Sequence, residues 1–226
     1  MFPSNLRSPQ KFKDRSINRQ TLYRQLFKNM ALLTKETSVE SKEIKNIIGS
    51  LVLAFNNDPI VRWMYPLAQQ YLNYFPDFLT AFGKNAFDSQ TVYYSDNYAG
   101  AAFWFPPHVE PNGDLIIETI QKTISVKLQT EVFSLLEQMS ELHPSEPHWY
   151  LGVLGVDPTR QKQGYGSKLI QDVLDLCDRA ELPAYLESSN PINLAFYEKH
   201  GFKVIGEIKT NTSPTMSAMI RYPKNS

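Results

Sequence analysis

The chain has 226 residues, of which 42% are hydrophobic and 12% aromatic, so it can bury a substantial core within one domain. Its 23 lysine and arginine residues balance 23 aspartate and glutamate residues, which argues against a nucleic-acid partner such as duplex DNA. No apolar run approaches the roughly 18 residues of a membrane span, and the first residues do not resemble a signal peptide, so we expect a cytoplasmic protein without a membrane partner.

Basic side chains dominate residues 1–30, where seven of them accompany a single acidic one, Asp14. We expect a flexible extension there, followed by one folded domain over residues 31–226. A solvated tail is the simpler interpretation of the extension, and an arm that binds nucleic acid or membrane is the alternative.

Apolar residues from Ser41 recur at i, i+3 and i+4, which predicts an amphipathic helix that ends near residues 56–59. Residues 63–82 contain seven aromatic side chains and predict two helices, or one helix broken near Pro66 and Pro76. We expect most of these rings to lie in the core and some to line a pocket.

Short β-prone runs at residues 91–94 and 101–105 predict a hairpin. Residues 114–141 are predicted to be helical, with an apolar face that includes Ile117, Ile120 and Ile124. Strands and helices then alternate, with strands predicted over residues 149–156, 184–187, 202–208 and 216–221 and helices over residues 168–180 and 191–200. This order predicts an α/β domain with a right-handed crossover.

The single cysteine, Cys177, lies on the apolar stripe of a predicted helix beside Val173 and Leu174. It has no internal disulfide partner, and a catalytic thiol would need an activating, partly exposed environment, so we interpret it as core packing. The four histidines are scattered without a cysteine or histidine cluster, and no metal site is predicted.

A glycine-containing turn connects the strand ending at Val156 to the next predicted helix. It consists of Gln161, Lys162, Gln163, Gly164, Tyr165 and Gly166, with Ser167 following. Glycines let a phosphate approach the backbone, and the free N–H groups at a helix start bind anions. The turn is neither a Rossmann fingerprint nor a nucleotide-triphosphate loop, because Leu169 fills the third glycine position and Lys168 follows Ser167.

Residues 154–169, with this turn between strand and helix, resemble the central motif of the GNAT acetyltransferase superfamily. Residues 185–202, which end in Phe-Tyr-Glu-Lys-His-Gly-Phe, are similar to its second motif. More narrowly, residues 148–203 closely and residues 50–107 loosely resemble the group formed by puromycin N-acetyltransferase and its bacterial and fungal relatives.

The resemblance implies a GNAT fold, with a mixed, mostly antiparallel twisted sheet, splayed central parallel strands and helices on both faces. It also implies that acetyl-CoA is the acyl donor and that a small-molecule primary amine attacks it directly in a ternary complex. The residues implied in cofactor binding are Leu154, Gly155, Val156, the segment from Gln161 to Ser167, and Asn190 or Asn193. Asn190 is alternatively a helix cap ahead of Pro191.

Two side chains are implied in the chemistry. Tyr197 lies where the superfamily places the phenol that protonates the CoA sulfur, and an ordinary pKa of about 10 would keep it protonated, although its ring could simply pack. Glu187 is the candidate general base, acting through water, and it could alternatively cap the following helix or bind the substrate ammonium.

The acceptor pocket is expected between the aromatic-rich residues 55–82 and residues 103–107, which favours an apolar or aromatic amine. Asp58 could attract an ammonium group, but Asn-Asp-Pro is also an ordinary turn signal. A protein or peptide N-acetyltransferase and a non-catalytic acyl-CoA-binding regulatory module are the alternatives. Either a monomer or a homodimer is compatible with the sequence.

Overall fold

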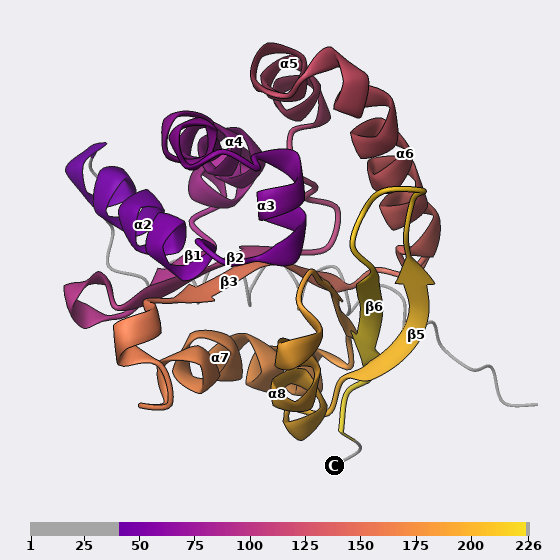
Figure 1. Ribbon diagram of the computed structural model, residues 1–226. Helices are drawn as coiled ribbons and strands as arrows, with labels where there is room; N and C mark the ends of the chain where they lie inside the picture. The colour runs from indigo at the N-terminus through magenta and orange to yellow at the C-terminus, as the bar shows by residue number, and fades with distance from the viewer. Residues whose placement is uncertain (1–40, 225–226) are drawn as a thin grey trace, which may run out of the picture. The chain divides into compact units, whose positions relative to one another are not determined.

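The computed structural model describes residues 41–224, so the predicted extension over residues 1–30 lies outside the described part of the chain. Six strands form one sheet in the order β1-β2-β3-β4-β6-β5 (Figure 1). Their bounds are Val92–Tyr94 (β1), Gly100–Phe105 (β2), Trp149–Val156 (β3), Ala184–Ser188 (β4), Lys203–Ile208 (β5) and Met216–Arg221 (β6). All neighbouring strands are antiparallel except β3 and β4, which confirms the predicted mixed sheet.

Helices cover both faces of this sheet (Figure 1), as expected for the fold. Those on one face are α2 (Ser41–Ala54), α3 (Pro59–Met64), α4 (Ala68–Asp88), α5 (Gly113–Thr123) and α6 (Val126–Leu142). The opposite face carries α7 (Tyr165–Ala180) and α8 (Leu194–Lys199). No helix within residues 41–224 combines the length and the apolar character needed to cross a membrane.

Two predictions about the helices were wrong. The chain breaks between α3 and α4 at Pro66, but Pro76 lies inside a continuous α4. A proline removes one helical hydrogen bond, and here the neighbouring Phe75 and Leu79 are each only 2% exposed, so packing of this face holds the helix together. In α5, Ile117 is 43% exposed, because residues four apart share a helix face and Ile116 and Ile120 take the buried positions.

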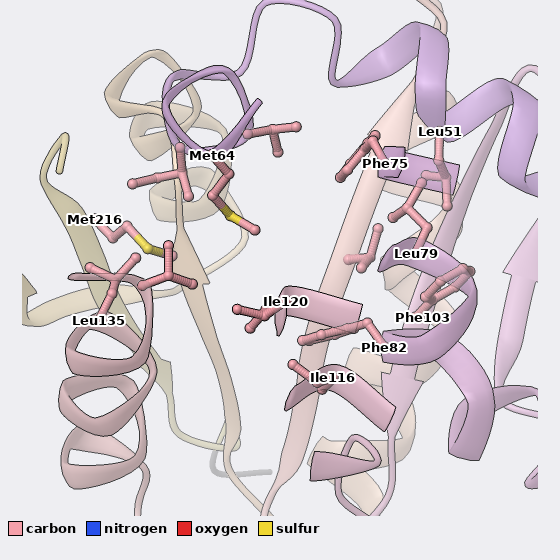
Figure 2. Close-up of a cluster of buried hydrophobic side chains, with 14 of the residues drawn as sticks. Leu51, Met64, Phe75, Leu79, Phe82, Phe103, Ile116, Ile120, Leu135 and Met216 are labelled. Atoms are coloured by element: carbon pink, nitrogen blue, oxygen red, sulfur yellow. The ribbon is translucent and has the colours of Figure 1, made fainter. Parts of the chain in front are cut away.

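The core lies between the sheet and helices α2 to α6. Figure 2 shows Phe82 of α4 beside Ile120 of α5, and Met216 near Leu135 of α6. On the other face, Cys177 of α7 is fully buried, and burial raises the pKa of its thiol to about 12. An unreactive packing role for Cys177 agrees with this environment.

Strands β3 and β4 pair only at their first residues. The parallel ladder contains Trp149 opposite Ala184 and Tyr150 opposite Tyr185, after which the two strands separate. In the β2–β3 ladder the register shifts so that Gly152 is skipped, which makes a bulge at the point of separation. A Cβ at Gly152 would lie 2.7 Å from the ring of Phe82 and 2.8 Å from that of Phe105, so any larger residue there would have to displace both rings.

Candidate active site

The predicted phosphate-binding turn leads directly into α7. Gly164 adopts a left-handed backbone conformation with φ of 87° and occupies the N-cap position of α7. Glycine has no side chain, so it forms no capping hydrogen bond there. The side-chain amide of Gln161 donates to the carbonyl of Val156 at 3.3 Å, which ties the turn to the end of β3. A helix start without a side-chain cap leaves its first N–H groups available to an anion.

Gly166 brings the two sequence motifs together. A Cβ at this position would lie 3.3 Å from the ring of Phe196 in α8 and 3.9 Å from the side chain of Val156 in β3. The first turn of α7 thus lies against both α8 and the end of β3. Gly166 and Phe196 are thirty positions apart in the sequence, so the two motifs meet in the folded chain.

Tyr197 is buried in α8, where its ring contacts those of Phe196 and Phe202 at centroid distances of 5.3 and 6.0 Å. Burial raises the pKa of Tyr197 well above its ordinary value, and the negative charge of Asp58 raises it further. The phenol therefore keeps its proton at neutral pH and can donate it.

The two candidate asparagines differ in their environment. The side-chain oxygen of Asn190 accepts a hydrogen bond from the N–H of Ile192 at 3.1 Å, so Asn190 caps the short 3-10 helix Pro191–Asn193 as one of the two interpretations predicts. The side chain of Asn193 is exposed and makes no capping bond at the start of α8.

A cavity of about 760 Å³, counting its open mouth, lies where β3 and β4 separate. Its walls are mostly apolar, and Figure 2 shows Met64, Leu135 and Met216 on one side with Phe75, Leu79 and Phe82 on the other. The ionisable and hydroxyl side chains that reach it are Asp58, Tyr150, Glu187 and Ser189. The arrangement suits a molecule with an apolar body and one positively charged end.

Asp58 caps a helix, as one of the two interpretations predicts, and it also lines the cavity. Its Oδ1 accepts hydrogen bonds from the N–H groups of Ile60 and Val61 at 3.0 and 3.1 Å and so caps α3. Its Oδ2 accepts a hydrogen bond of 2.5 Å from the hydroxyl of Ser189, and both side chains line the cavity. Burial raises the pKa of Asp58, partly offset by these three hydrogen bonds. Ser189 lies within the second motif, yet the sequence alone gave it no role.

Glu187 is almost fully buried, with 2% of its side chain exposed, and it lines the same cavity. Its Oε1 lies 3.0 Å from Nε2 of His143, a residue that sequence reasoning missed. Since Asn190 caps the helical turn that follows β4, capping does not account for the position of Glu187.

Comparisons with known proteins agree with this geometry. Residues 92–202 match the family model described as "Acetyltransferase (GNAT) family". An uncharacterised N-acetyltransferase of Schizosaccharomyces pombe is 27% identical over 203 residues, which cover 82% of each chain.

Two solved structures share the fold. Arylalkylamine N-acetyltransferase 2 from Aedes aegypti aligns with a TM-score of 0.55 at 14% identity, over 82% of this chain and 96% of that one. A protein from Corynebacterium glutamicum described as "histone acetyltransferase HPA2 and related acetyltransferase" aligns with a TM-score of 0.51 at 22% identity, over 83% and 94% of the two chains.

Proposed function

Because the chain is an N-acetyltransferase of the GNAT family, we propose that it transfers the acetyl group of acetyl-CoA to the primary amine of a small apolar or aromatic molecule. The observation that carries this proposal is the cavity at the separation of β3 and β4, whose apolar walls end at the carboxylates of Asp58 and Glu187. The name of the Aedes aegypti structural neighbour, an arylalkylamine N-acetyltransferase, is consistent with an acceptor of this kind.

The donor would bind across β3, α7 and α8. In this proposal the backbone N–H groups from Gln161 to Ser167 hold the diphosphate, and the backbone of Leu154, Gly155 and Val156 holds the pantetheine arm. Asn193 is the better candidate for a side-chain contact with that arm, because the oxygen of Asn190 is already occupied by its cap.

The reaction requires a neutral amine, a polarised carbonyl and a proton for the departing sulfur. Asp58 and Glu187 attract the ammonium, and Glu187 takes one proton from it, directly or through water. The amine then attacks the thioester carbonyl, whose oxygen is stabilised by a backbone N–H of β3. As the carbon–sulfur bond breaks, Tyr197 protonates the thiolate. The second proton of the attacking nitrogen then passes through water to the Tyr197 phenolate, which leaves a neutral amide and restores the phenol.

A thiol-release assay with acetyl-CoA tests this function. Phenylethylamine, tryptamine, an aminonucleoside such as puromycin, agmatine, and peptides with free N-termini or lysines serve as acceptors. We expect thiol release with apolar arylalkylamines above the rate without enzyme. Faster release with peptides would favour a protein acetyltransferase instead, and acetyl-CoA binding without thiol release for every acceptor would overturn the proposal.

The resemblance of two motifs to those of puromycin N-acetyltransferase and its relatives does not single out an antibiotic as the acceptor. The same donor site and the same catalytic groups would serve other amines, and acceptor choice depends on the walls of the cavity. The aminonucleoside in the acceptor set tests this narrower possibility directly.

A further inference from the structure

The carboxylate of Glu187 lies between the acceptor cavity and a histidine. Glu187 lines the cavity, and on its other side Nε2 of His143 is 3.0 Å from its Oε1. His143 directly follows α6 as its C-cap residue, and 28% of its side chain is exposed, against 2% for Glu187. A proton taken up by Glu187 is thus enclosed by protein, whereas His143 has access to water.

The other titratable groups around His143 are poor proton acceptors at neutral pH. The phenol rings of Tyr150 and Tyr185 lie 4.7 and 4.5 Å from its ring, measured between centroids. Burial raises the pKa of both phenols, and the charge of Glu187 raises them further, so both remain protonated. The ring of His148 is farther away, at 5.6 Å, and burial lowers its pKa. Its Nδ1 is engaged with the carbonyl of Glu146 at 2.8 Å.

We propose that His143 carries to solvent the proton that Glu187 takes from the substrate ammonium, so that the Glu187 carboxylate is regenerated in every turnover. His143 would touch no substrate atom and would act only through Glu187. The inference rests on the proposed function, because it assumes that Glu187 is the base for an amine acceptor.

One proton moves through three groups in this relay. The ammonium gives a proton to the Glu187 carboxylate, leaving a neutral amine and a carboxylic acid. The acid then passes its proton to Nε2 of a neutral His143 ring that carries its hydrogen on Nδ1. The resulting imidazolium releases the Nδ1 proton to water, and tautomer exchange through water resets the ring. His143 and Glu187 are close but not aligned as a hydrogen bond, so a rotation of the ring or carboxyl precedes the transfer.

Chemical rescue tests the relay. His143→Ala and His143→Gln would be assayed with the best amine from the acceptor screen, with imidazole or pyrazole added at equal concentration. We expect kcat to fall by about tenfold or more, with the KM for acetyl-CoA little changed. Imidazole should restore part of the rate in a concentration-dependent manner, whereas pyrazole, a ring of similar size and far weaker basicity, should not.

His148→Gln is the matched control, because its ring lies in the same cluster but its Nδ1 is held by the carbonyl of Glu146, and it should keep the wild-type rate. In a Glu187→Gln background, removal of His143 should have little further effect, since the two groups act in series. If His143→Ala does not fold, the same measurements on His143→Gln test the relay.

A wild-type rate in the His143 variants, or a slow rate that imidazole does not raise, would overturn the relay and leave the proposed function intact. If the wild-type enzyme acetylates none of the amines, the proposed function and the relay both fail.

Discussion

Tyr197 combines deep burial with a phenol that keeps its proton. If it protonates the CoA thiolate, Tyr197→Phe should lower kcat by about 100-fold while changing the KM for acetyl-CoA only slightly, because the ring still packs against Phe196 and Phe202. Steady-state thiol release measures both constants, and Tyr222→Phe, at a residue that is 61% exposed, is the control. An unchanged kcat in Tyr197→Phe would mean that another group protonates the sulfur.

Asp58→Asn removes the negative charge of this side chain but keeps an oxygen that can cap α3. Asparagine still accepts hydrogen bonds at the start of α3, so we expect a loss of no more than about 1 kcal/mol in the free energy of unfolding, from the bond to Ser189. The KM for the acceptor amine should rise by about tenfold or more, because the ammonium loses an anionic partner.

The pH dependence of the acceptor KM provides a second measurement on Asp58. Burial raises the pKa of the carboxyl, so Asp58 becomes protonated, and loses its attraction for ammonium, at a higher pH than an ordinary aspartate. The wild-type acceptor KM should therefore increase as the pH falls through this raised pKa, and the increase should be smaller in Asp58→Asn. Identical profiles for the two proteins would remove Asp58 from amine binding.

The site was only partly predictable residue by residue. Tyr197 and Glu187 were predicted as catalytic residues from local motifs, and Glu187 lines the cavity where β3 and β4 separate. His143 and Ser189 were not predicted. Their carboxylate partners, Glu187 and Asp58, are 44 and 131 positions away in the sequence. A local pattern does not predict which distant carboxylate a histidine or serine will contact.

Arg221 of β6 connects its strand to α7 and to the residue that follows α8. Its side chain, 3% exposed, binds Asp178 of α7 at 2.7 Å and the carbonyl of His200 after α8 at 3.1 Å. Arg221→Ala would leave Oδ2 of Asp178 and this carbonyl without the guanidinium, while Oδ1 of Asp178 still accepts from the N–H of Lys224. We expect a cost of about 2 to 3 kcal/mol in the free energy of unfolding. Urea denaturation measures this loss.

Lys84→Ala is the comparison for Arg221. Lys84 and Asp88 form a pair one turn apart on α4, with 48% and 58% of their side chains exposed, and water screens such a pair. The stability change should be far smaller than that of Arg221→Ala. Equal losses in the two variants would show that the Arg221 contacts contribute no more than a surface pair.

Most elements were predictable because apolar spacing follows the helix and strand periods, and turn residues separate the segments. The features that could not be predicted depend on tertiary contacts. Whether Pro76 interrupts α4 depends on how firmly Phe75 and Leu79 pack into the core, which spacing does not reveal. The separation of β3 from β4 was expected only through family resemblance, since strand pairing leaves no local signature.

At the scale of the whole domain, acetyl-CoA should stabilise the fold, because the proposed donor site joins β3, α7 and α8. A ligand present at 100 times its Kd adds about 2.7 kcal/mol to the free energy of unfolding. Gly164→Asp and Gly164→Asn test whether this stabilisation comes from diphosphate binding at the start of α7. At φ of 87° both side chains are accommodated with similar strain, and a Cβ there meets no other protein atom within 4 Å.

The two Gly164 variants should therefore have similar stability without ligand, measured by thermal or urea unfolding. Acetyl-CoA should stabilise the wild type strongly, Gly164→Asn less and Gly164→Asp least, because a carboxylate at the start of α7 repels the diphosphate. Pantetheine, which lacks the diphosphate, should affect all three proteins equally. If Gly164→Asp gains as much from acetyl-CoA as the wild type does, the diphosphate binds elsewhere, and the turn from Gln161 to Gly166 is only a tight connection between strand and helix.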